Sequence, residues 1–180
     1  RLESPPDGAV LALLKGARDD DGETAISAVW ALGSLGAPAA VPALEELYGS
    51  NDAGVRKMVV YALGAVSGER QLSTLRLALD DPAVDVQWNA AVALSRHGDE
   101  SGVPVLRRML DRVYVERVMT RTLSGDTDVD TAADVIIGGI QAVMALGDTS
   151  LREPVQMLSQ SDDNLRVRQA ALEALKHIGA

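Results

Sequence analysis

A short motif returns along this chain at a spacing of 31 residues. Its first three copies begin at Ala31, Ala62 and Ala93 and read Ala-Leu-Gly, Ala-Leu-Gly and Ala-Leu-Ser. It returns at Ala145, one period plus 21 residues later, and again at Ala174. Because a repeat of this length cannot bury its apolar face alone, successive copies must stack on one another. The period therefore predicts a solenoid, a form that presents long surfaces to other molecules.

One copy of the repeat, residues 52–79, illustrates the expected unit. Ser50, Asn51 or Asp52 is suited to cap a helix start, apolar residues follow at helical spacing, and Gly68 offers a C-terminal stop. A second apolar run covers residues 72–79. Hydrophobic residues are 47% of the chain, but aromatics are only 3% and Phe is absent, so Ala, Leu and Val must fill the core. The pattern predicts a helix, a tight turn and a second helix.

The segments 52–64 and 163–175 resemble HEAT repeats, and most closely the short type found in phycobilin lyase subunits. The resemblance covers about residues 9–179. It implies an all-α fold, an α-solenoid of about five stacked HEAT-like hairpins. In that family the first helices line the convex side and the second helices the concave side.

The resemblance also implies Asp–Arg contacts between successive repeats. The family's Arg after Val appears here only at Arg56 and Arg168. Ala25, Gln87 and Gly139 stand at that position in the other copies. We therefore expect such a ladder of contacts to be incomplete.

We expect residues 1–180 to form a single solenoid domain. Residues 163–178 predict a first helix with no second helix after it, which is typical of a fragment of a longer chain. Solenoids normally need polar caps. Self-association, a partner or more chain would then have to cover the apolar residues of this last helix, which are Leu165, Leu172, Leu175 and Ile178.

The 21 extra residues between Ala93 and Ala145 predict an insertion at about residues 113–133. We expect the second helix of the third repeat to run on to Leu123 and a turn to follow at residues 124–128. Asp130 or Thr131 then caps an extended helix. Insertions in repeats often lie on the binding face. A tolerated surface loop is the alternative, since long loop additions cost little stability.

A cluster of Arg residues, which begins at Arg96, surrounds this insertion in an otherwise acidic chain. Four-residue spacing places Arg108 with Arg112, and Arg117 with Arg121, on shared helix faces. Guanidinium groups suit carboxylates and phosphates. Ordinary pairing with nearby acids such as Asp111 and Glu116 is the alternative. The expected partner-binding residues are Arg107, Arg108, Arg112, Tyr114, Arg117 and Arg121.

Several classes of site are not expected. The net charge of −9 and the pI of about 4.6 argue against nucleic-acid binding, and no apolar run approaches the ~20 residues that span a bilayer. Cysteine is absent, so disulfides and thiolate metal sites are excluded. We expect no cofactor, no metal ion and no catalytic residue.

Two comparisons with metal proteins fail on particular residues. Asp126, Asp128 and Asp130 have the spacing of a calcium loop, but Thr131 and Ile137 replace the required Gly and Glu. Deoxyhypusine hydroxylase is built from similar repeats but needs several His-Glu pairs, which this chain lacks, so that enzyme is excluded. The only histidines, His97 and His177, stand near helix ends, where a structural role suffices.

Aromatic residues divide between the two helices of the repeat. Trp30 and Trp88 lie on first helices, where packing is the default role. Tyr48 and Tyr114 lie on second helices and are better candidates for a groove.

The sequence thus favours a non-catalytic interaction scaffold, not an enzyme, that binds a protein or peptide on the concave face. The alternative is a subunit of a bilin lyase-like modifying enzyme that holds an anionic ligand through the Arg cluster.

Overall fold

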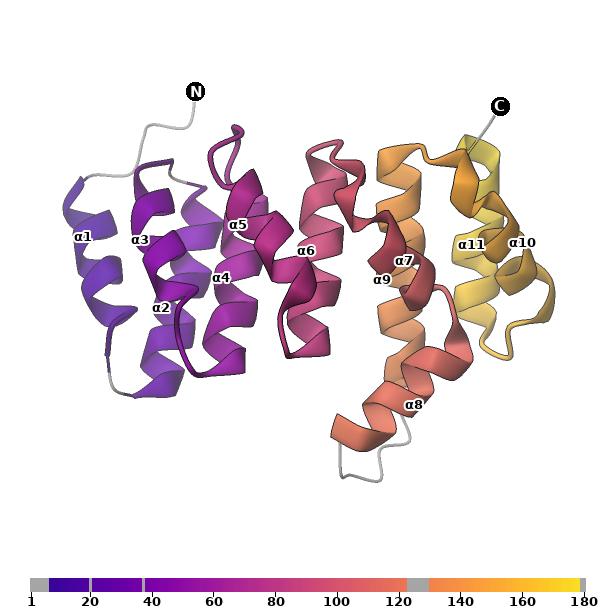
Figure 1. Ribbon diagram of the computed structural model, residues 1–180, viewed down its shortest axis with the longest axis horizontal. Coiled ribbons are helices and arrows are strands. Elements are labelled where there is room, and N and C mark those ends of the chain that lie inside the picture. The colour runs from indigo at the N-terminus through magenta and orange to yellow at the C-terminus, as the bar shows by residue number, and fades with distance from the viewer. Residues whose placement is uncertain (1–6, 20, 37, 123–129, 179–180) are drawn as a thin grey trace. The chain divides into compact units, whose positions relative to one another are not determined.

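The computed structural model describes residues 7–19, 21–36, 38–122 and 130–178 (Figure 1). The chain divides into two compact units, Arg1–Leu94 and Ser95–Ala180, and each is described by itself. The regular structure of the described residues is entirely helical, and each unit stacks helical hairpins. The predicted all-α repeat fold is confirmed. The single domain over residues 1–180 stays a prediction.

The described part of the first unit contains three first helices, Gly22–Leu35, Ala53–Ala65 and Val84–Arg96, with shorter helices packed beside them. Its first helices lie side by side in Figure 1, and α4 packs against α2 as well as against the second helices on either side of it. The elements are α1 (Asp7–Gly16), α2 (Gly22–Leu35), η1 (Pro38–Ala40), α3 (Val41–Leu47), α4 (Ala53–Ala65), α5 (Leu72–Leu77), η2 (Ala78–Asp80) and α6 (Val84–Arg96), whose last two residues fall in the second unit.

Local caps set the ends of these helices. The Asp52 carboxylate accepts hydrogen bonds from the backbone N–H groups of Gly54 and Val55, which α4 leaves without an intrahelical partner. Asp21 does the same for Thr24 at the start of α2. At the end of α2, Gly36 takes the left-handed conformation with φ of 57°, which favours glycine.

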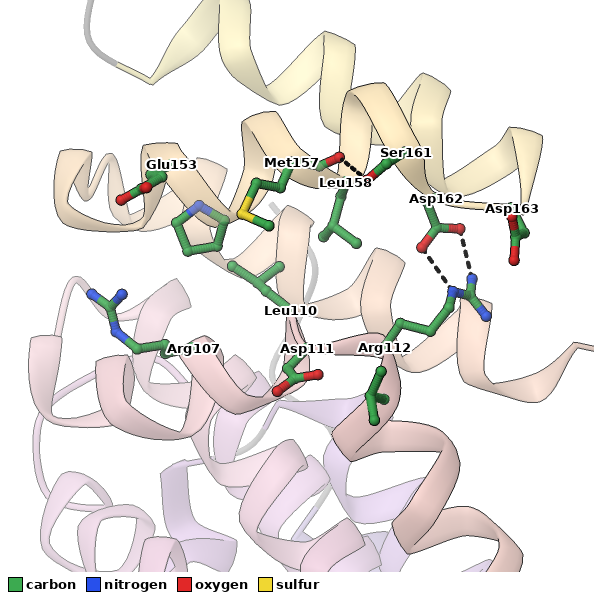
Figure 2. Close-up of a pocket in the computed structure, with 12 residues that line it drawn as sticks. Arg107, Leu110, Asp111, Arg112, Glu153, Met157, Leu158, Ser161, Asp162 and Asp163 are labelled. Atoms are coloured by element: carbon green, nitrogen blue, oxygen red, sulfur yellow. Dashed lines mark hydrogen bonds and ion pairs between the residues drawn. The ribbon is translucent and has the colours of Figure 1, made fainter.

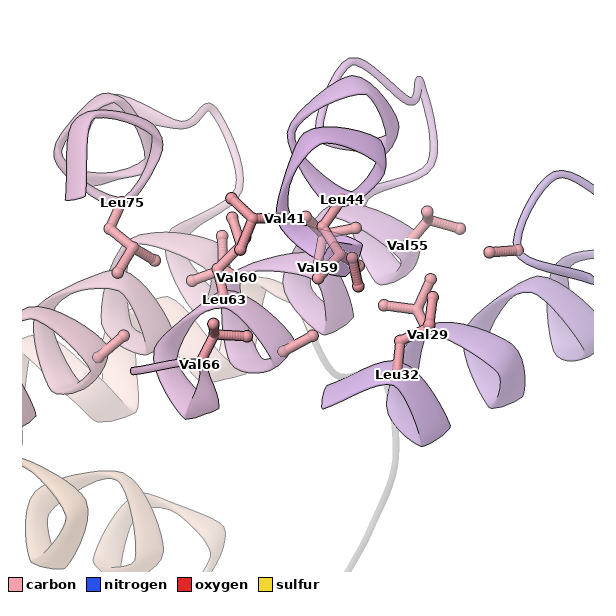
Figure 3. Close-up of a cluster of buried hydrophobic side chains, with 14 of the residues drawn as sticks. Val29, Leu32, Val41, Leu44, Val55, Val59, Val60, Leu63, Val66 and Leu75 are labelled. Carbon is pink, nitrogen blue, oxygen red and sulfur yellow. The ribbon is translucent and has the colours of Figure 1, made fainter. Parts of the chain in front are cut away.

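The Ala-Leu-Gly motif is explained by the packing of one first helix on the next. A Cβ at Gly33 would lie 2.7 Å from the Cα of Ala62, and a Cβ at Gly64 would lie 2.6 Å from the Cβ of Ala93. In the first two copies, the Gly thus makes room for the Ala of the following copy. The Leu of the first three copies, at Leu32, Leu63 and Leu94, is fully buried in the apolar core between the helices (Figure 3).

The second unit carries the insertion. Its α9 begins at Thr131, as predicted, because the Asp130 carboxylate accepts a hydrogen bond from the N–H of Ala133. This first helix packs against α7, α8 and α11. The elements are η3 (Glu100–Gly102), α7 (Val103–Met109), α8 (Arg112–Thr122), α9 (Thr131–Leu146), η4 (Thr149–Leu151), α10 (Arg152–Ser161) and α11 (Leu165–His177).

The second helix before the insertion does not run on as expected. It stops at Met109, and a separate helix, α8, begins at Arg112. The break has a local cause, since the Asp111 carboxylate accepts a hydrogen bond from the N–H of Tyr114 and so caps α8. Leu123 and the expected turn at residues 124–128 lie outside the described residues.

The last described helix exposes apolar side chains on one face. Leu165 is 59% exposed and Leu172 is 53% exposed. At the repeat position of Leu172, Val29, Val60 and Val143 are fully buried. This face of α11 is therefore the kind of surface that stacking covers elsewhere in the chain.

Candidate functional site

The predicted partner-binding residues fall on two helices rather than one. Arg107 and Arg108 lie in the last turn of α7, whereas the other four lie on α8. The expectation that Arg108 and Arg112 share a helix face is wrong, because α7 ends at Met109 and a separate helix begins at Arg112. Arg117 and Arg121 do share one helix, although the Arg121 side chain lies outside the described residues.

Arg112 is engaged in ion pairs rather than open to solvent. Its Nε and Nη2 donate to the two carboxylate oxygens of Asp162, each at 2.7 Å (Figure 2). Its Nη1 lies 3.1 Å from Glu116 and 3.3 Å from Asp130. The Asp162 hydrogen bond, ahead of the Glu116 bond, raises the pKa of the Arg112 guanidinium. Arg112 therefore pairs with acidic residues of its own unit, which is the alternative to partner binding that the sequence left open.

A second bidentate pair lies in the first unit. Arg56 Nε and Nη2 donate to the carboxylate of Asp81 at 2.8 and 2.9 Å, and the Tyr48 hydroxyl donates to the same carboxylate at 2.9 Å. Burial and this hydrogen bond raise the pKa of Tyr48 to about 12. The Tyr48 hydroxyl thus has a structural partner in this network, and a role for Tyr48 in a groove stays a prediction.

The two pairs occupy the same place in the repeat. Asp81 and Asp162 each stand twelve residues before the motif Ala, at Ala93 and Ala174. In the first unit the Arg that pairs with the Asp is Arg56, which stands at the position where HEAT repeats carry an Arg after Val. In the second unit the corresponding position on α9 is Gly139, and Arg112 of the insertion contacts the Asp instead.

A groove lies between α7 and the start of α8 on one side and α10 on the other, with a volume of about 610 Å³. Figure 2 shows Leu110, Met157 and Leu158 between Glu153 at one end and Asp163 at the other. Met157 is 62% exposed, and Val113 at the start of α8 is 64% exposed. The residues that line it are Arg107, Leu110, Asp111, Arg112, Val113, Glu153, Pro154, Met157, Leu158, Ser161, Asp162 and Asp163.

Among the predicted site residues whose side chains are described, two line this groove. Arg107 and Arg112 do so, whereas Arg108 stands over the Tyr114 ring, 6.0 Å from its centroid. Sequence reasoning missed the whole contribution of α10, residues 152–161. The apolar stripe of α10 was visible in the sequence, but nothing in it indicated that α10 faces α7 and α8.

The described residues contain no group of three or more His, Cys, Asp and Glu side chains placed to hold a metal ion. His177 lies on the surface, 3.3 Å from the Glu173 carboxylate. Asp126 and Asp128 of the rejected calcium loop lie outside the described residues. None of the helices described here reaches the length and hydropathy that a bilayer crossing requires.

Two family models match the chain. The model of HEAT repeats matches residues 10–86, and the model of the PBS lyase HEAT-like repeat matches residues 86–112. The chain is a HEAT-repeat protein. Its insertion and groove are therefore variations on a repeat that is otherwise defined by core positions.

This HEAT-repeat protein is similar in sequence to Deoxyhypusine hydroxylase-B of Oryza sativa subsp. japonica. The two are 32% identical over 169 residues, which are 92% of this chain and 49% of the rice protein. The chain thus spans about half the length of the curated relative that it matches. The exclusion of that enzyme on the missing His-Glu pairs stays a prediction.

The fold is similar to two solved structures. One is the complex of CpcE and CpcF of phycocyanin lyase from Nostoc sp. PCC7120, with a TM-score of 0.70, 20% identity, and coverage of 99% of this chain and 68% of the other. The other is an engineered protein with a TM-score of 0.52, 21% identity, and coverage of 97% and 85%. At these identities, the two structural similarities establish the fold of this HEAT-repeat protein and nothing about its activity.

The expectation that the chain is not an enzyme is wrong. The curated relative that it matches at 32% identity is named as a hydroxylase, which contradicts that expectation. The absence of nucleic-acid binding stays a prediction.

Proposed function

We propose that this HEAT-repeat protein is a subunit of an enzyme that modifies another protein, and that its groove holds a segment of a partner chain in that assembly. One observation carries the proposal. A groove of about 610 Å³ with exposed apolar side chains lies between α7 and α10, in a chain that shares its fold with subunits of a lyase complex. A bound segment can cover the exposed apolar side chains of such a groove with its own, which removes both from water.

The alternative ligand is an anionic cofactor held by the Arg cluster, such as a bilin with its carboxylates. Arg107 favours it, because its side chain is exposed at the rim of the groove. Arg112 argues against it, because its guanidinium is already occupied by Asp162, Glu116 and Asp130. The geometry supports a protein segment better than an anion.

Deletion of the gene in the source organism tests the enzyme role. We expect at least one protein to lose a covalent modification in the deletion strain, as read by peptide mass mapping. Wild-type protein restores it, and Met157→Asp does not, because the new carboxylate disrupts the apolar part of the groove. Leu77→Asp is the matched control, since Leu77 is 63% exposed on α5 of the first unit, and it restores the modification.

An unchanged pattern of modifications in the deletion strain would overturn the enzyme role. Absorbance of the purified protein mixed with a bilin separates the two ligands. A red-shifted, stoichiometric spectrum would favour the anionic cofactor over the protein segment.

A further inference from the structure

We infer that the groove between α7 and α10 takes a segment of another protein that carries apolar side chains beside Lys or Arg. The inference deepens the proposed function and rests on it, since it states the chemistry of the partner segment.

The apolar part of the groove is large enough to contribute to binding. Met157 on α10 is 62% exposed and Val113 on α8 is 64% exposed, and the buried Leu110 and Leu158 also line the groove. Covering such side chains removes apolar surface from water, which is worth about 25 cal/mol per Å². A partner segment must therefore present apolar side chains to this surface.

The charges around the groove select a basic partner. Asp111, Glu153 and Asp163 line it, are exposed, and form no ion pair with any residue that the structure describes. Only two Arg side chains line the groove against its four carboxylates, which leaves a net charge of −2.

Each of these Arg side chains is held by a contact within the chain. Arg112 forms its bidentate pair with the buried Asp162. Arg107 lies at the end near Glu153 and donates from Nη2 to the backbone oxygen of Ser150. Arg107 therefore offsets charge at the Glu153 end, and the Asp163 end in Figure 2 is the side where a Lys or Arg of the partner meets the exposed Asp163 carboxylate. The whole chain has a net charge of −9, which also attracts a cationic segment.

Fluorescence anisotropy with a defined probe tests the inference on the full chain. The probe is a fluorescein-labelled amphipathic peptide of Leu and Lys, about 12 residues long, which as a helix spans about 18 Å. One control peptide has Glu in place of Lys, and another has Ser in place of Leu. We expect binding of the Leu-Lys peptide alone, and we expect it to weaken as salt rises.

Two groove variants and two matched controls test whether the peptide binds in the groove. Glu153→Gln combined with Asp163→Asn weakens binding about 5-fold at low salt, because it removes two exposed charges. Met157→Ser weakens it by a similar factor of about 5 through lost apolar contact. Glu23→Gln with Glu69→Gln, which removes the same charge from exposed positions of the first unit, leaves the affinity unchanged, as does Leu77→Ser.

Equal affinity for the Leu-Glu peptide, or an equal loss in the control variants, would overturn the inference, as would no binding at all. Far-UV circular dichroism verifies that each variant is folded. The assay contains no modification reaction, so its outcome is independent of the deletion experiment. Groove binding with an unchanged modification pattern would contradict the enzyme role alone.

Discussion

At the scale of single residues, the closest approaches between helices decide which side chains are allowed. Gly64 of α4 lies where a Cβ would come within 2.6 Å of the Cβ of Ala93, whereas Gly138 of α9 has open space around it. Both are inside helices, where Ala is favoured over Gly by about 1 kcal/mol. Whether a Gly-to-Ala substitution stabilises or destabilises the protein is therefore decided by the side chain that packs against the site, not by helix propensity.

We expect Gly64→Ala to lower the free energy of unfolding by about 1–3 kcal/mol, because the added methyl group forces two first helices apart. Gly138→Ala should raise it by about 0.5–1 kcal/mol, since it only restricts the unfolded chain. Urea unfolding followed by far-UV circular dichroism measures both. A stabilising effect of both substitutions would contradict the close approach.

The buried Asp81 makes the stability depend on pH. Burial alone would raise the pKa of the Asp81 carboxyl, but the hydrogen bonds from Arg56, the Ala83 N–H and Tyr48 outweigh it and lower that pKa. A depressed pKa in the folded state adds stability that is fully present above the unfolded value of about 3.9. This stability is lost as the pH falls through the folded value.

We therefore expect the free energy of unfolding of the wild-type protein to fall below about pH 4. The measurement is urea unfolding at a series of acidic pH values. Asp81→Asn should start from a lower stability at neutral pH and show a shallower acid dependence. An identical pH profile for the two proteins would exclude Asp81 as a source of the acid sensitivity.

At the scale of elements, the insertion supplies a contact that its repeat lacks. The position of Arg56 is occupied on α9 by Gly139, where a Cβ would lie 3.0 Å from the Cβ of Met109. An Arg side chain there would collide with α7. Arg112 of α8 instead approaches Asp162, so the insertion connects α8 to the loop before α11.

Arg112→Gln should lower the free energy of unfolding by about 3 kcal/mol, because it leaves the buried carboxylate of Asp162 without its counter-charge. Arg166→Gln is the matched control. Its pair with Asp134 is exposed on both sides, so its loss should cost less than about 1 kcal/mol. Chemical unfolding of the two variants measures the difference, and equal losses would contradict a structural role for α8.

The exposed apolar face of α11 is a candidate surface for self-association, and self-association stays a prediction. We expect the protein to show concentration-dependent association in sedimentation velocity through Leu165 and Leu172. Leu172→Lys should reduce it without loss of helix content, because this side chain is 53% exposed in the single chain. Association that persists unchanged in the variant would place it elsewhere.

At the scale of the whole molecule, the two compact units should differ in their unfolding. Stability in stacked repeats is a sum of unit and neighbour terms, so cooperativity across a long array is limited. Both Trp residues, the buried Trp88 and the 54% exposed Trp30, lie in the first unit. Helical signal comes from both units.

We expect urea unfolding monitored by Trp fluorescence to have a different midpoint from unfolding monitored by far-UV circular dichroism. The difference arises because fluorescence follows the first unit alone. Coincident curves from the two probes would mean that the chain unfolds in one cooperative transition.

Most of the helices could be predicted from the sequence because their signals are local. Asp52 and Asp130 begin helices at the expected places, and Gly36 ends one. The break before α8 was missed, although Asp111 is as good a cap as these. The apolar pattern continues through residues 106–123, and periodicity alone does not distinguish one long helix from two short ones.

The sequence by itself determined the repeat, the helix type, the main caps and the membership in the HEAT-repeat family, because each depends on residues close together in the chain. The tertiary structure decided what the charged side chains do. Arg112 meets Asp162 fifty positions along the chain, and the groove draws its other wall from α10. Spacing within one helix carries no information on which helix will face it, so only packing could turn an expected binding residue into a structural ion pair.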